Sequence, residues 1–152
     1  MAKPTGRSVV LAVAAISTIS CLLFDTAPIA IAAQSRDQVL HVTIDVKPGD
    51  EPTSIEPKRE GMVPIAILSS KQFDATQIDP ATIRAGAKGS EAAIFRTSLE
   101  DINGDRSTDM MALFRVAELG LDCSGKSITV KGRTKDKKEF EGTETVVMIG
   151  CK

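Results

Sequence analysis

The chain has 152 residues, of which 42% are hydrophobic and 26% charged, with 19 basic and 20 acidic side chains. This length fits one domain once any targeting segment is removed, and the absence of a basic patch makes nucleic acid an unexpected partner. The chain contains no Trp and no Tyr, so it lacks the side chains that most often form flat sugar-binding platforms and interface anchors.

The first 33 residues have the three parts of a secretory signal peptide. Lys3 and Arg7 begin it, the uncharged and mostly apolar run "VVLAVAAISTISCLLF" follows, and small residues precede a cleavage point after Ala32 or Ala33. The run is short for a membrane span, which needs about 20 apolar residues. We therefore predict that residues 1–33 are a cleaved signal peptide and that the protein is secreted or periplasmic. The alternatives are an uncleaved anchor and lipidation at Cys21.

Removal of residues 1–33 leaves residues 34–152, which we predict to form a single domain. Two of the 19 basic residues and one of the 20 acidic residues are lost, so the net charge becomes −2. Two of the three cysteines remain, Cys123 and Cys151. An even pair in an exported chain predicts a disulfide, which would restrict the unfolded ensemble by roughly 3 to 4 kcal/mol. The alternative is a pair of buried free thiols.

The domain begins with patterns typical of β-strands. From residue 38 the text "QVLHVTIDV" alternates and then ends at Pro48, as in a half-buried strand; its apolar face consists of Leu40, Val42, Ile44 and Val46. The run "MVPIAIL" has the length of another strand, and Pro64 places it at a sheet edge or a bulge.

Turn signals and further short strands follow. In "IDPAT" we expect Asp79 to start a short helical turn with Pro80 at its first position. Strands are expected in "AAIFRTSLEDI" and "MMALFRV", and the turn "KDKK" joins "SITVKGRT" and "EFEGTETVVMIG" in a predicted hairpin. Short strands with turns about every 8 to 12 residues predict an all-β antiparallel β-sandwich of immunoglobulin-like type. We expect its core to contain Phe73, Phe95, Phe114 and Phe140.

The segment "DINGDRSTD", residues 101–109, has the spacing of a calcium loop. Calcium takes about six to eight oxygen ligands, several of them anionic. Counted from Asp101, the third, fifth, seventh and ninth places hold Asn103, Asp105, the Ser107 carbonyl and Asp109. We predict that these five residues bind structural Ca²⁺. The alternative is an Asx-rich turn satisfied by its own backbone.

Two positions distinguish this segment from an EF-hand loop. Arg106 stands at the sixth place, where an EF-hand has glycine, and Ala112 at the twelfth, where it has a bidentate glutamate. These differences exclude a helix-loop-helix EF-hand and leave a shorter strand-loop-strand form that closes at Asp109. Without the twelfth-place carboxylate, and with a cation beside the ion, we expect modest affinity.

The text around the loop carries a family resemblance. "LEDINGDRSTDMMALF" resembles the calcium loops of FG-GAP repeats and dockerins, although the flanking text matches neither repeat. Across residues 42–151, "VTIDVKPGD", "GMVPIAILSSKQFDATQIDPATIRAG", "LFRVAELGL" and "GTETVVMIG" are similar to a β-rich domain of secreted bacterial proteins of unknown function. The resemblance implies an exported β-rich module with a calcium-type loop and brings no catalytic activity; Arg106 stands where that family commonly has glycine.

Few residues point to catalysis. His41 is the sole histidine, so catalytic zinc and a Ser-His-Asp triad lack their usual base, and we expect a solvated strand residue. Glu139 and Glu141, on one face of a predicted strand, resemble a glycosidase carboxylate pair. We predict a non-enzymatic module, adhesive or envelope-associated, with an unknown extracellular or envelope partner and no transmembrane span after cleavage. The alternatives are a secreted hydrolase of carbohydrate or peptide that uses loop carboxylates, and a small inhibitor or ligand-binding protein.

Overall fold

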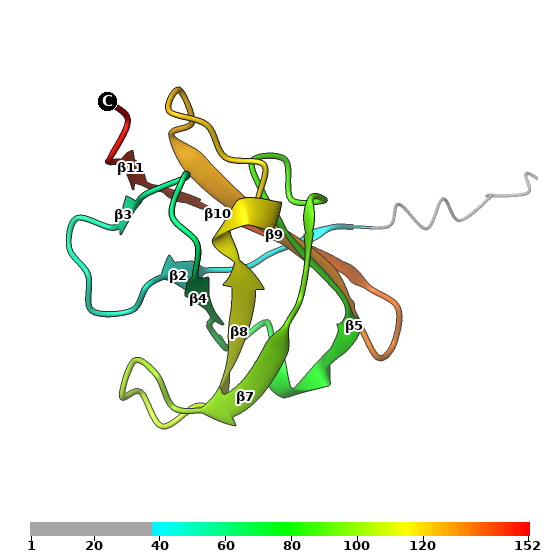
Figure 1. The fold of residues 1–152 in the computed structure, drawn as a ribbon. Helices are drawn as coiled ribbons and strands as arrows, with labels where there is room; N and C mark the ends of the chain where they lie inside the picture. Colours follow the sequence, from blue (N-terminus) through cyan, green and yellow to red (C-terminus); the bar gives the residue numbers. More distant parts are fainter. Residues whose placement is uncertain (1–37) are drawn as a thin grey trace, which may run out of the picture. The chain divides into compact units, whose positions relative to one another are not determined.

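A computed structural model of the chain describes residues 38–152, and the predicted signal peptide at residues 1–33 lies outside the described residues. Eleven short β-strands and two single-turn 3-10 helices make up this part of the chain (Figure 1). Within it, no helix has the length and apolar character that a membrane crossing requires.

The strands form two larger sheets and one small one. The four-stranded sheet has the order β2 (Ile44–Val46), β4 (Met62–Ile67), β8 (Asp109–Arg115), β7 (Arg96–Glu100), and all its pairs are antiparallel. The five-stranded sheet has the order β1 (Leu40–His41), β10 (Glu139–Thr145), β9 (Ser127–Thr134), β5 (Ile78–Gly86), β6 (Ala92–Ala93), with only β1 and β10 parallel. β3 (Ser54–Ile55) and β11 (Val147–Met148) form a short parallel pair. The 3-10 helices are η1 (Ala75–Gln77) and η2 (Val116–Glu118).

Alternation along the strands places one face of each larger sheet in a shared core. Ile65 and Phe114 from the four-stranded sheet belong to the same buried cluster as Val130 and Phe140 from the five-stranded sheet. The Phe140 ring also packs against Phe73, with 5.4 Å between the ring centroids. The predicted all-β sandwich of mainly antiparallel strands is therefore confirmed. Its immunoglobulin-like topology stays a prediction.

The predicted first strand is divided between the two sheets. β1 pairs with β10, whereas β2, three residues later, pairs with β4. The crossing segment runs close over Gly142, because the Val42 N–H donates to the Glu141 carbonyl (2.9 Å). A Cβ on Gly142 would lie 2.8 Å from the Val42 carbonyl oxygen and 2.6 Å from the Ile44 side chain. The alternation survives the crossing, and Ile44 and Val46 are buried as expected.

The expected position of "MVPIAIL" at a sheet edge or a bulge is wrong, because β4 lies between β2 and β8 and pairs with both in a continuous register. The short length of β2 explains how a proline is tolerated there. The β2–β4 ladder ends with Val46 opposite Ile65, and the next contact is a single bond from the Lys47 N–H to the Pro64 carbonyl (2.8 Å). The Lys47 carbonyl accepts instead from the Asp50 N–H (3.0 Å), so the donor that proline lacks is not needed.

The predicted helical turn at Asp79 and Pro80 is also wrong, because both residues belong to β5. The register of β5 against β9 shifts between Asp79 and Arg84, so the turn-forming residues produce an irregularity inside a strand. The helical turn lies earlier, at η1, where the Asp74 carboxylate caps it by accepting the Thr76 N–H (2.9 Å). The predicted hairpin around "KDKK" is confirmed as β9 and β10.

Three of the four phenylalanines expected in the core are buried, but Phe95 is 58% exposed. A β-bulge accounts for the difference. Arg96 pairs with Leu113, and the Phe95 N–H also donates to the Leu113 carbonyl (2.8 Å), so two residues oppose one. Because of the bulge, the Phe95 side chain does not point into the core as the alternation along the strand would require. The Arg115 guanidinium lies 5.1 Å from the centroid of the Phe95 ring.

Candidate functional site

The acidic segment forms the loop between β7 and β8, which are joined at its base by the Glu100–Asp109 pair. The Asp101 carboxylate organises this loop. One oxygen accepts the N–H groups of Gly104 (2.8 Å) and Asp105 (3.1 Å), and the other accepts that of Arg106 (2.9 Å). The backbone therefore curls around the first carboxylate of the sequence pattern.

Asn103, Asp105 and Ser107 continue the same local network. The Asp105 N–H donates to the Asn103 side-chain oxygen (3.0 Å), and the Ser107 N–H donates to the Asp105 carboxylate (2.7 Å). The pKa of Asp105 is lowered, first by the backbone N–H of Ser107 and then by the side chains of Asn103 and Ser107. Asp105 is consequently a carboxylate at neutral pH.

Arg106 has a φ of 70°, in the left-handed region that glycine adopts without steric cost. This is the sixth place of the loop, where EF-hand loops have glycine for a sharp turn. The backbone at this position thus makes the glycine-type turn although the residue is arginine.

Asp109 has a different environment from the other acidic residues of the loop. Its side chain is fully buried, one oxygen accepts the Ser69 N–H (2.7 Å), and the other accepts the Ile102 N–H (3.0 Å). The Ser69 side chain donates in turn to the Thr108 carbonyl (2.6 Å). Asp109 therefore anchors the loop to the chain that follows β4. Ser69 is 40 residues distant in the sequence, so no local signal pointed to it.

The loop has oxygen donors of the kind that calcium prefers. Asp101, Asn103 and Asp105 lie together in the exposed turn with Ser107, while Asp109 is fully buried. Among residues 38–152 no three His, Cys, Asp or Glu side chains are gathered in a way that would hold a metal ion. The five-residue calcium assignment stays a prediction.

The paired strand carboxylates that resembled a glycosidase site are held in cross-strand ion pairs. Glu139 lies 2.9 Å from the Arg133 guanidinium and Glu141 lies 3.1 Å from the Lys131 ammonium. Both pairs follow directly from the β9–β10 register, which places these residues opposite each other. Both carboxylates therefore have a basic partner on the neighbouring strand.

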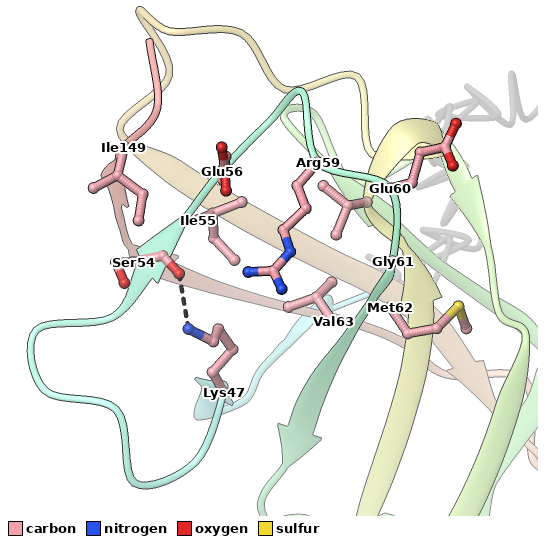
Figure 2. A pocket seen from close by; sticks show the side chains of 11 residues that line it. Lys47, Ser54, Ile55, Glu56, Arg59, Glu60, Gly61, Met62, Val63 and Ile149 are labelled. Carbon is pink, nitrogen blue, oxygen red and sulfur yellow. Dashed lines mark hydrogen bonds between the residues drawn. The ribbon is translucent and has the colours of Figure 1, made fainter.

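Asp45 on β2 is a carboxyl group with a raised pKa, caused first by burial and then by the negative charge of Glu51. A raised pKa in a cleft would be a signature of acid–base chemistry. Neither Asp45 nor Glu51 lines the hollow shown in Figure 2. We therefore assign no catalytic role to this pair.

The hollow in Figure 2 has a volume of about 380 Å³ and lies between β3, the 56–61 loop and the start of β4. Ile55 and Val63 contribute buried apolar surface to it. The Arg59 guanidinium points into the hollow over Val63, and the Lys47 ammonium donates to the Ser54 carbonyl (3.1 Å) (Figure 2). The hollow was not predicted, because its lining comes from separate segments. It combines apolar surface with two cations and the two carboxylates Glu56 and Glu60.

The predicted disulfide between Cys123 and Cys151 is present, with 5.7 Å between the two Cα atoms. It ties the turn before β9 to the chain end that follows β11. Because β11 pairs with β3, the disulfide also restrains the small parallel sheet.

Comparison of the chain with protein-family models, with curated proteins and with solved structures finds no match.

Proposed function

We propose that the protein is an exported, non-enzymatic β-sandwich module, adhesive or envelope-associated, whose acidic loop binds calcium for a structural purpose. The disulfide supports export, because such bonds persist in oxidising compartments. The proposed non-enzymatic role rests on one observation, which is that these carboxylates have structural partners. Glu139 and Glu141 are held by cations across the hairpin, and Asp109 is a buried acceptor of backbone N–H groups.

Two features of the loop support calcium binding. Asp101, Asn103 and Asp105 bring side-chain oxygens into one exposed turn, and Arg106 has the left-handed backbone of a calcium-loop glycine. The Asp101 oxygens already accept three N–H groups, so an ion competes with bonds that the loop makes by itself. We therefore expect a Kd on the order of 10⁻⁴ to 10⁻³ M, as in extracellular modules.

Thermal unfolding in millimolar calcium and in excess chelator tests this binding. At a calcium concentration ten times the Kd, the free energy of unfolding should rise by about 1.4 kcal/mol, so the melting temperature rises while the apo protein still folds. Asp105→Ala should remove this rise. Asp136→Ala, which removes a carboxylate from the β9–β10 turn, is the matched control and should retain it. Identical melting curves with and without calcium would favour the polar turn.

The hydrolase alternative makes a different prediction. A panel of carbohydrate and peptide substrates should yield no turnover with the purified protein. Turnover that disappears in Glu139→Gln or Glu141→Gln, with the melting temperature retained, would show that the strand carboxylates are catalytic and would overturn the non-enzymatic role.

A further inference from the structure

β7 leaves one long edge of the sandwich without a partner strand. It is the last strand of the four-stranded sheet and has five residues, whereas β2 at the opposite edge has three. The edges of the five-stranded sheet, β1 and β6, have two residues each. β7 is therefore the longest of the four strands that end the two larger sheets within residues 38–152. The outward backbone N–H and C=O groups of an edge strand are a template for another strand.

Apolar side chains accompany this edge. Leu99 is 53% exposed although it pairs with the buried Met110, so it lies on the core side of the sheet at a place that the described residues leave uncovered. Phe95, directly before β7, is 58% exposed. Contact with a neighbouring strand would bury part of both side chains.

The charged residues of β7 have an arrangement that suits antiparallel pairing of two copies of this strand. The outer face of β7 carries Arg96, Ser98 and Glu100. The cation lies two residues before Ser98 and the anion lies two residues after it. Neither Arg96 nor Glu100 takes part in an ion pair within residues 38–152. The Glu100 carboxylate accepts the Ser98 hydroxyl at 3.2 Å.

We propose that two copies of this chain associate through antiparallel pairing of their β7 strands about a twofold axis at Ser98. In this arrangement Arg96 of each copy lies opposite Glu100 of the other, and Thr97 lies opposite Leu99. The same surface is used by both copies, as a closed symmetric dimer requires. The dimer extends two four-stranded sheets into one.

Backbone geometry limits the possible registers. On an edge strand, every second residue points its backbone N–H and C=O groups outward. When two copies of β7 pair through hydrogen bonds, odd-numbered residues must therefore lie opposite odd-numbered residues and even-numbered opposite even-numbered. The axis then lies at Thr97, Ser98 or Leu99. An axis at Thr97 places Arg96 opposite Ser98, and an axis at Leu99 places Glu100 opposite Ser98. Only the axis at Ser98 places both charged residues of one copy, Arg96 and Glu100, opposite residues of opposite charge in the other copy.

The contact is small, and this determines the expected behaviour. A standard stable interface buries about 1,600 Å² in total, which pairing of five residues per copy does not approach. We therefore expect a reversible dimer whose population depends on protein concentration and falls at high salt, because the ion pairs are exposed.

Sedimentation velocity over a concentration series, with the purified chain at low salt, tests the proposal. Arg96→Glu places like charges opposite each other twice, as does Glu100→Arg, so each variant should dimerise more weakly by on the order of tenfold or more. An equimolar mixture of the two variants should recover association, because the two anions on β7 of one variant then face the two cations on β7 of the other.

The matched control is Lys58→Glu, an exposed lysine far from β7 in the sequence, whose replacement changes the net charge as much as Arg96→Glu does. This variant should dimerise like the unaltered chain, and all variants should retain the melting temperature of the parent. A parent chain that stays monomeric throughout the series would overturn the proposal. So would a variant mixture that associates no more than each variant alone, because the charges would then not lie opposite each other.

Discussion

At the residue scale, the acidic loop contains carboxylates with two distinct roles. Asp105 is exposed and accepts bonds within the turn, whereas Asp109 is buried and accepts N–H groups from two separate segments. Hydrogen bonds to a charged group contribute more to stability than neutral ones, and a buried donor left without its acceptor is costly. Stability should therefore depend far more on Asp109 than on Asp105 when no calcium is present.

We predict that Asp109→Ala lowers the free energy of unfolding by about 3 kcal/mol, because the Ser69 and Ile102 N–H groups lose their shared acceptor. Asp109→Asn should lose less, since the amide keeps one oxygen acceptor. Urea unfolding in excess chelator measures both, with Asp105→Ala as the exposed control. A loss for Asp109→Ala no greater than that for Asp105→Ala would show that burial of Asp109 has little energetic weight.

The backbone at Arg106 leads to a second prediction at this scale. A left-handed conformation costs a non-glycine residue roughly 1 to 2 kcal/mol, so Arg106→Gly should raise the melting temperature even in chelator. It should also enlarge the additional rise caused by calcium, because a positive charge beside the ion is removed. Comparing the variant with the parent in both buffers separates the two effects. A variant that melts below the parent in chelator would contradict the predicted relief of backbone strain.

At the scale of elements, aspartates hold the turns between strands. The pKa of Asp122, in the turn before β9, is lowered first by the Ser124 side chain and then by the Ser124 N–H. The pKa of Asp74, which caps η1, is lowered first by the Thr76 side chain and then by the Thr76 N–H. A lowered folded-state pKa stabilises the fold above the unfolded value and loses this contribution as the pH falls through the folded value.

We therefore predict that the contribution of these aspartates is present above the ordinary aspartate pKa of 3.8 and is lost as the pH falls below it. The urea midpoint measured between neutral pH and about pH 2 should show this slope. Asp122→Asn should make the slope shallower, because one carboxylate of lowered pKa no longer titrates. An unchanged slope in this variant would mean that Asp122 binds protons equally in the folded and unfolded chain.

The crossing from β1 to β2 depends on Gly142 in β10. A methyl group there would press on the Val42 carbonyl and the Ile44 side chain. We expect Gly142→Ala to destabilise the fold by about 1 to 3 kcal/mol, the usual cost of added volume in a packed site. Thr145→Ala, on an exposed position of the same strand, is the control and should change stability little. Chemical denaturation compares the two, and equal stabilities would show that the crossing segment can shift aside.

At the scale of the whole molecule, the disulfide closes a separation of 28 residues and restrains the chain end on the β3–β11 pair. We predict that Cys151→Ser destabilises the protein by about 2 to 5 kcal/mol, the range for native disulfides of small secreted domains. Mass mapping without reduction should recover one linked peptide that contains Cys123 and Cys151. Two thiols open to alkylation in the isolated protein would contradict the bond.

Several properties could be read from the sequence because they depend on neighbouring residues. Alternation from Leu40 to Val46 determined which side chains face inward, and turn residues divided the chain into short strands, so the all-β class followed. The parity of the cysteines outside residues 1–33 likewise predicted the Cys123–Cys151 bond. The spacing of residues 101–109 predicted a calcium loop, with an Asx-rich turn as the alternative, and the distant partner of its last carboxylate was not visible.

The tertiary structure decided what depends on distant neighbours. Pro64 lies inside a sheet because β2 ends before reaching it, and Phe95 faces outward because a bulge opposite Leu113 changes the alternation. Asp109 is a buried acceptor because the fold brings Ser69 to it. Hydrophobic periodicity reports which side of a strand is buried, whereas strand neighbours, bulges and buried acceptors arise from pairings between segments far apart in the chain.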